Sequence, residues 1–180
     1  MIRIALIASL FLISTLGHSQ VWMSKNVSIR FFSATPVEDI EAKTNSAAAA
    51  LNIQNKKIFV KTAIKSFKFK SGLMQEHFNE NYMESDKYPS AEFDGQIDGD
   101  VDMTKDGEKQ VLAKGKLTLH NVTKEREIPA TITIKDGKIS AKSIFKIKPQ
   151  DHNVEIPKLV VKNIAEEIEV TLQAELTPKK

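Results

Sequence analysis

The sequence contains no cysteine at any of its 180 positions. This absence excludes disulfide frameworks, thiolate nucleophiles and zinc sites with cysteine ligands. The chain also lacks internal repeats, and the alanine tract at 47–50 is its only low-complexity stretch. A single domain of ordinary size, residues 20–180, can bury enough apolar surface to fold without a disulfide or a metal.

Catalytic and metal-binding motifs are missing as well. We find no G-x-S-x-G elbow, no S-x-x-K motif, no phosphate-binding loop and no dinucleotide fingerprint. Three histidines follow the first nineteen residues, His77, His120 and His152, and each stands apart from the others. Metal sites favour paired ligands at short spacing, so no metal site and no catalytic residue are predicted. The sequence therefore favours a binding protein over an enzyme.

Long hydrophobic runs are absent except near the start. The longest apolar run, Ile4–Ile13, covers ten residues, whereas a membrane-spanning helix needs about 20. Gly17 and Ser19 follow it as the small residues of a signal-peptidase site. Residues 1–19 are thus predicted to be a signal peptide, with no cysteine for a lipid anchor. We expect a periplasmic or secreted protein with no stable membrane span.

Charge of one sign is not in excess either. Without residues 1–19 the chain keeps 25 basic and 23 acidic side chains. Nucleic-acid binding favours clustered positive charge, so a nucleic-acid partner is not expected. The lysines between Lys56 and Lys70 alternate with apolar residues and indicate one solvated face of a strand.

Alternation of apolar and polar residues dominates what remains. It begins near Asn26, recurs over about eight segments and predicts half-buried strands joined by short turns. The Asp136–Gly137 pair indicates a two-residue hairpin. The tract SAAAALNIQN is ambiguous, because alanine favours helix while its flanks favour strand. An all-β fold follows, either a barrel or a sandwich.

Small inward residues favour the barrel. Ala42, Ala91, Gly95, Ala113 and Gly115 are among them, and many small residues leave room inside a sheet of eight strands. They could also serve only to let the strands bend, and the pattern leaves both readings open.

The segment LMQEHFNENYMESDKYP, residues 73–89, departs from the alternation. Within residues 71–84 it predicts one short helical segment, because its apolar residues gather on one side of a helix. Such a segment either plugs the core or closes over a cavity as a lid. Methionine and aromatic side chains suit contact with varied apolar ligands.

These residues resemble the YceI-like family of exported lipid- or polyisoprenoid-binding proteins. The resemblance is carried by HFNENYMESDKYPSAEFDGQI, by VSIRFFSATPVEDIEAKT and by GKLTLHNVTKEREIPATITI, and it extends from Val27 to Leu176. It implies an antiparallel, eight-stranded, lipocalin-like barrel with a helical segment. It also implies carriage or storage of a polyisoprenoid or similar long-chain amphiphile in the cell envelope, without catalysis or a further cofactor. The bound ligand would be an isoprenoid or an isoprenoid-quinone-like lipid.

The proposed site consists of large apolar residues on the strands and on the helical segment. Around the lipid tail we predict Phe31, Phe59, Ile64, Phe67, Phe69, Phe93, Leu117, Leu119, Phe145 and Ile147. At the cover we predict Leu73, Met74, Phe78 and Tyr82. The parity of Phe67 and Phe69 differs from that of Ile64, so their inward direction requires a bulge.

Two other classes of function remain open at this stage. One is a β-sandwich interaction module of the cell envelope with a filled core. The other is a small envelope hydrolase or isomerase that uses Glu76, His77 and Glu80. The sequence also leaves a homodimer open.

Overall fold

A computed structural model describes residues 20–99, 101–157 and 161–179. The predicted signal peptide, residues 1–19, lies outside the described residues. The strands, in chain order, are β1 (Val21–Ala34), β2 (Asp39–Asn52), β3 (Lys57–Ala63), β4 (Lys68–Phe69), β5 (Ser90–Asp98), β6 (Gly107–Leu119), β7 (Val122–Lys135), β8 (Lys138–Ile147) and β9 (Ile168–Pro178). The helical segments are η1 (Ile64–Ser66), α1 (Gly72–His77), η2 (Phe78–Tyr82), η3 (Pro149–His152) and η4 (Val161–Asn163).

The sheet is antiparallel and closes on itself. Its order is β1-β9-β8-β7-β6-β5-β3-β2, and β1 also pairs with β2 from Val21↔Asn52 to Ala34↔Asp39. The two-residue strand β4 pairs with Ala42 and Lys43 of β2, beyond the part of β2 that pairs with β3. The prediction of an eight-stranded antiparallel barrel with one short helical segment is therefore confirmed, and the sandwich alternative is wrong.

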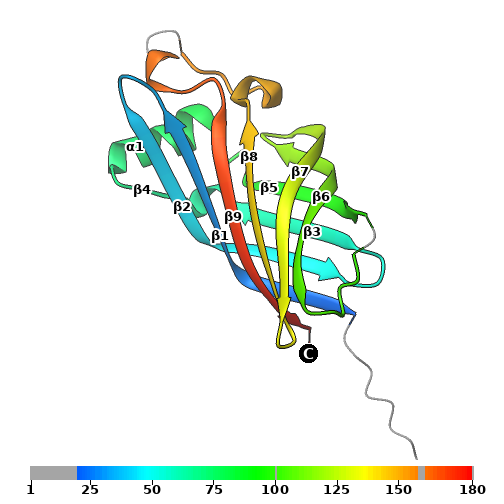
Figure 1. The fold of residues 1–180 in the computed structure, drawn as a ribbon. Helices are drawn as coiled ribbons and strands as arrows, with labels where there is room; N and C mark the ends of the chain where they lie inside the picture. The colour runs from blue at the N-terminus through cyan, green and yellow to red at the C-terminus, as the bar shows by residue number, and fades with distance from the viewer. Residues whose placement is uncertain (1–19, 100, 158–160, 180) are drawn as a thin grey trace, which may run out of the picture.

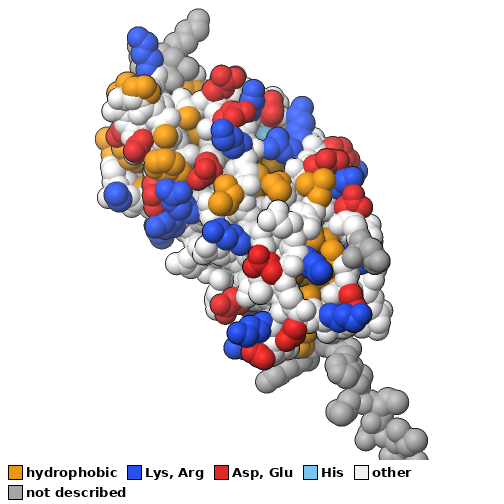
Figure 2. All heavy atoms as spheres, in the orientation of Figure 1, with side chains coloured by type: hydrophobic (Ala, Val, Ile, Leu, Met, Phe, Trp, Pro, Cys, Tyr) orange, Lys and Arg blue, Asp and Glu red, His pale blue; other side chains and the backbone are white. Residues whose placement is uncertain are grey.

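The barrel is elongated, and its two ends differ (Figure 1). The helix α1 and the segment between β8 and β9 lie at one end, while the β7–β8 hairpin and the C-terminus lie at the other. We call the first end the mouth and the second end the base. The side of the molecule shown in Figure 2 carries acidic and basic side chains interspersed with apolar ones.

The first strand begins earlier than the alternation indicates. β1 starts at Val21, five residues before Asn26, because a register shift between Ser24 and Val27 interrupts the period of two. The alanine tract belongs to β2. Ala47 and Ala49 are buried inside the barrel, while Ala48 faces solvent and pairs with Lys61 of β3.

Two tight turns set the register at opposite ends of β7. Asp136 and Gly137 both have positive φ, which confirms the predicted hairpin between β7 and β8. His120 and Asn121 form a second two-residue turn, between β6 and β7, also with positive φ at both positions. This geometry matches the twist of antiparallel strands.

An ion-pair cluster on the outer face joins the strands where the barrel closes. Arg30 of β1 contacts Glu41 of β2 at 2.8 Å and Glu169 of β9 at 3.7 Å. The hydrogen bond from Arg30, reinforced by Lys43, lowers the pKa of Glu41 to about 2. Arg30 also lies over the ring of Phe32 at 4.6 Å.

Two facing glycines bring β5 and β6 unusually close together. Gly95 pairs with Gly115, and a Cβ at Gly95 would lie 2.8 Å from the ring of Phe93. A Cβ at Gly115 would overlap the backbone of Asp94 and Gly95. The absence of a side chain at Gly95 therefore leaves room for the Phe93 ring, and its absence at Gly115 lets the backbones of β5 and β6 approach each other.

We predict that Gly115→Ala lowers the free energy of unfolding by about 1–3 kcal/mol, because the added methyl group forces β5 and β6 apart. Urea denaturation measures the loss. Gly72→Ala is the matched control, since a Cβ there meets nothing within 4 Å and should change stability by less than about 1 kcal/mol. Equal stability of Gly115→Ala and the parent chain would contradict the close approach.

Candidate functional site

The mouth half of the barrel encloses a cavity of about 520 Å³. Inward side chains of all eight ring strands line it, and nearly all of them are apolar. Its volume lies within the range of about 300–1,000 Å³ that is usual for small-molecule sites. The interior is therefore not filled by the protein's own side chains.

The structure places thirteen of the fourteen predicted residues at this cavity. From the wall they are Phe31, Ile64, Phe67, Phe69, Phe93, Leu117, Leu119, Phe145 and Ile147. From the helical segment they are Leu73, Met74, Phe78 and Tyr82. Whether these residues contact a ligand stays a prediction.

Phe59 is the exception, and its placement inside was wrong. It does not line the cavity and is 39% exposed on the outer face of β3. Its neighbours Ile58 and Val60 line the cavity instead. In a strand adjacent side chains point to opposite faces, so Phe59 and Ile58 cannot both point inward.

Phe67 and Phe69 do point inward, although their parity differs from that of the preceding strand. A 3-10 turn, η1, follows β3 and changes the direction of the chain before β4. The change of parity thus comes from a helical turn, where the sequence indicated a bulge.

Several lining residues were missed because they lie outside regular strands. The segment between β8 and β9 contributes Pro149, Val154, Ile156 and Ile164. Ile164 lies before the last strand, because β9 begins at Ile168. The sequence shows these residues only as isolated apolar positions in an irregular segment. Such positions do not indicate which part of the barrel they cover.

A cluster of four phenylalanines packs the helical segment against the wall; Phe78 comes from the segment and the other three from the wall. Phe78 lies 5.4 Å from Phe31, 6.0 Å from Phe67 and 5.0 Å from Phe69, measured between ring centroids. Phe31 also lies 5.4 Å from Phe67 and 5.6 Å from Phe69. These separations are typical of stabilising aromatic pairs.

The helical segment is a cover and not a plug. Ser71 caps α1 by accepting a hydrogen bond from the Met74 backbone N–H at 3.3 Å. No residue of α1 or η2 is buried, and Leu73 is 61% exposed although it also lines the cavity. The segment continues as a π-helix, in which the Met83 N–H donates to the Phe78 carbonyl at 2.9 Å. Such wide turns are frequent at functional sites.

Three polar side chains at the cavity, Ser33, Ser143 and Glu92, have partners within the protein, whereas the buried Thr62 hydroxyl has none among the described residues. Ser143 donates to the Pro129 carbonyl at 2.6 Å, and the Ser33 hydroxyl accepts from the Ala165 N–H at 2.8 Å. Glu92 pairs with Lys61 at 2.7 Å, and this hydrogen bond lowers the pKa of Glu92. The side chains of Ser143, Ser33 and Glu92 therefore already bond to other groups of the protein.

The residues of the hydrolase alternative do not assemble into a site. His77 lines the cavity, whereas Glu76 and Glu80 are exposed and do not line it. Among the described residues, no hydrogen bond joins His77 to either carboxylate. The arrangement expected of an acid–base pair is not formed.

Two other histidines join the segments around the mouth. The His120 Nε2 lies 3.1 Å from Glu84 Oε2, and its Nδ1 lies 3.2 Å from the His152 carbonyl. The edge of His120 packs against Tyr88 with the ring centroids 4.3 Å apart. Both neighbours of the ring nitrogens are acceptors, so both contacts are hydrogen bonds only when the ring carries two protons.

His152 is fully buried and suits the neutral form. Its Nδ1–H donates to the Val122 carbonyl at 3.0 Å, while Nε2 has no partner among the described residues. Burial lowers the pKa of His152, and the nearby charge of Arg126 adds to this shift, although the hydrogen bond to the Val122 backbone and the charge of Asp151 oppose it. Burial therefore disfavours the charged form of His152.

We predict that stability falls as the pH is lowered through about 6.5, the ordinary pKa of histidine. The unfolded chain binds the proton at a higher pH than buried His152 does, so acid favours unfolding and the contribution of neutral His152 is complete above that pH. Melting temperatures between about pH 7.5 and 5 should fall less steeply in His152→Gln. His77→Gln, an exposed control, should retain the parent profile. Parallel profiles for His152→Gln and the parent would contradict the assignment.

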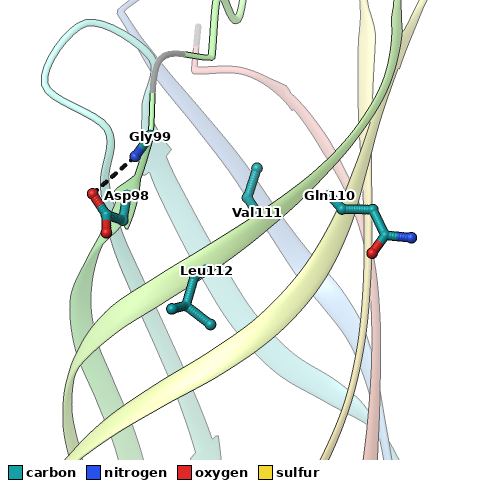
Figure 3. Close-up of a pocket in the computed structure, with 5 residues that line it drawn as sticks. All are labelled: Asp98, Gly99, Gln110, Val111 and Leu112. Carbon is teal, nitrogen blue, oxygen red and sulfur yellow. Dashed lines mark hydrogen bonds between the residues drawn. The ribbon is translucent and has the colours of Figure 1, made fainter.

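A second hollow lies near the base and carries no set of converging polar groups (Figure 3). It measures about 340 Å³ and is lined by Asp98, Gly99, Gln110, Val111 and Leu112. Val111 and Leu112 point in opposite directions along β6. Asp98 is already occupied by the Gly99 N–H at 2.9 Å and by Lys114 at 2.7 Å.

Within the described ranges, no three histidine, aspartate or glutamate side chains gather as a metal-binding group. None of the helices formed by those residues is long and apolar enough to cross a membrane.

Comparison with known proteins identifies the fold's relatives. Residues 15–176 match the YceI-like domain. A polyisoprenoid-binding domain from Saccharophagus degradans, implicated in plant cell wall breakdown, aligns with a TM-score of 0.75 at 12% identity, covering 89% of this chain and 99% of its own. BcnA of Burkholderia cenocepacia gives 0.72 at 15% identity, covering 84% and 96%. The YceI protein of Campylobacter jejuni gives 0.66 at 18% identity, covering 82% and 90%. No curated protein matches significantly.

Proposed function

The chain belongs to the YceI-like family, and from this premise we propose that it is an exported lipid-binding protein of the periplasm or the secreted fraction. It holds a polyisoprenoid, an isoprenoid quinone or a similar long-chain amphiphile inside the barrel, for carriage or storage in the cell envelope. It binds without catalysing a reaction. The observation that carries the proposal is the apolar cavity of about 520 Å³ within a closed barrel.

The chemistry of the wall favours an apolar chain as the occupant. Transfer of apolar surface from water contributes about 0.8 kcal/mol per methylene. Several isoprene units therefore offset the association cost of about 4–15 kcal/mol. Ser33, Ser143 and Glu92 each have a hydrogen-bond partner inside the protein, so these three side chains do not require a polar ligand group deep in the cavity. The domain from Saccharophagus degradans, described as polyisoprenoid-binding, has the same fold.

The mouth is where a polar head group fits. Glu38, His77 and Asn163 line the cavity near the β1–β2 turn, the cover and η4. A tail inside the barrel with its head at this end leaves the polar group near water. The tail then supplies most of the binding free energy.

We predict that protein purified from its native host carries an organic-extractable amphiphile with a long apolar chain. Extraction followed by mass spectrometry detects it. The refolded, delipidated chain is the matched blank, because it passes through the same solvents. Identical spectra from the native protein and the blank would sink the proposal.

Affinity should respond to chain length and hardly to salt. Each added methylene should lower the Kd about fourfold until the cavity is full. Raising the salt concentration should change the Kd less than about twofold, because little of the binding free energy comes from charge. Displacement of a fluorescent apolar probe by prenyl alcohols measures both. A Kd that depends strongly on salt and weakly on length would contradict an apolar tail site.

A further inference from the structure

The interior of the barrel is hollow only in its mouth half. In the base half the inward side chains pack against one another, and Val27, Leu51, Ile97, Ile139 and Leu176 are all buried there. None of these five lines the cavity, although they point into the same barrel. The cavity thus ends partway along the barrel, where the packed half begins.

On several strands the cavity ends between one inward residue and the next, two positions along the strand. Ala130 of β7 lines the cavity, while Ile132, the next inward residue, does not and is 3% exposed. Ala141 of β8 lines the cavity, while Ile139 does not and is 0% exposed. The same step separates Ile29 from Val27 on β1, Ala113 from Val111 on β6 and Leu172 from Ala174 on β9.

We call Val27, Val111, Ile132, Ile139 and Ala174 the floor layer. The register places three of its members beside the lining residues Ala130 and Ala141. Ile132 pairs with Ala141, and Ala141 pairs with Ala174. Val111 pairs with Ala130. Ala130 and Ala141 therefore lie beside members of the floor layer on the neighbouring strands, and one inward step from Ile132 and Ile139 on their own strands.

We propose that this floor layer fixes the maximum length of the apolar chain that the protein accommodates, and that Ala130 and Ala141 contact the end of that chain. The inference rests on the proposed lipid-binding function and adds its length specificity. On β8 the cavity extends from Ala141 to Ile147, about 20 Å along the strand. With the usual barrel tilt this corresponds to a depth of about 15 Å. A chain longer than that must fold back or emerge under the cover beside exposed Leu73.

The test is a chain-length series of prenyl alcohols: geraniol, farnesol, geranylgeraniol and solanesol. Their affinities for the full chain without residues 1–19 are measured by displacement of a fluorescent apolar probe. The affinity of the parent protein should rise along the series and then stop rising. In Ala141→Leu the rise should stop at least one alcohol earlier. The Kd for the longest alcohol that the parent still favours should increase roughly tenfold or more, while that of geraniol changes less than about twofold.

Ala48→Leu is the matched control, because Ala48 carries the same substitution on the exposed outer face of β2. It should leave the whole series unchanged. Ala130→Leu is a second filling variant, and both filling variants add bulk to open space, so they should retain the parent melting temperature. Ile132→Ala removes bulk from the floor layer, and when folded it should move the limit toward longer alcohols.

The outcomes separate this inference from the proposed function. A parent protein that binds none of the alcohols overturns both. A parent that binds them, with Ala141→Leu and Ala130→Leu showing the same length limit as Ala48→Leu, overturns the floor layer alone. An equal loss of affinity for all four alcohols in the filling variants also overturns it, because a stop at the chain end spares the short ligands.

Discussion

Pairing of β1 with β2 joins the two edges of the sheet, and the cavity depends on this closure. An open sheet of this size would have to bury its apolar face against another layer, and its core would then be filled. A closed sheet of eight strands instead encloses its own interior, whose volume is set by strand number and tilt. The bulk of the inward side chains then decides how much of that volume stays empty. Arg30, Glu41 and Glu169 join the three strands at the closure from outside, where they take no interior space.

Large inward side chains fill the base half of the barrel, and smaller ones line part of the mouth half. The barrel therefore has both a packed core and a cavity. The base half buries valine, leucine, isoleucine and methionine side chains, which supplies the core that a chain of this size requires. The mouth half places alanine or serine at Ala113, Ala130, Ala141 and Ser143 among larger apolar neighbours. A dry apolar void would cost stability if it stayed empty. An apolar occupant restores the lost contacts, so stability and binding are linked in the same space.

Much of this arrangement could be predicted from the sequence, because alternation with a period of two reports which face of a strand a residue occupies. It placed Phe93, Leu117 and Phe145 inside, where the structure has them. The prediction failed at Phe59, which was chosen for its large aromatic ring and against the alternation. Ile58 and Val60 point into the barrel, and Phe59 between them points outward. The prediction also missed two features that alternation does not indicate. The 3-10 turn before Phe67 and the path of the segment from Pro149 to Ile164 depend on contacts between residues distant in the chain.

The cover is held by interactions of two kinds. In its middle, where α1 meets η2, Phe78 packs against Phe31, Phe67 and Phe69, and these contacts are apolar. After η2, Glu84 contacts His120, which in turn contacts the carbonyl of His152, and these contacts are polar. An apolar chain entering the barrel offers the phenylalanine rings equivalent contacts, because dispersion and burial do not depend on the partner's identity. It offers the carboxylate and the imidazole nothing in exchange. The free-energy cost of displacing the cover is therefore lower at the phenylalanine contacts than at the contact between Glu84 and His120.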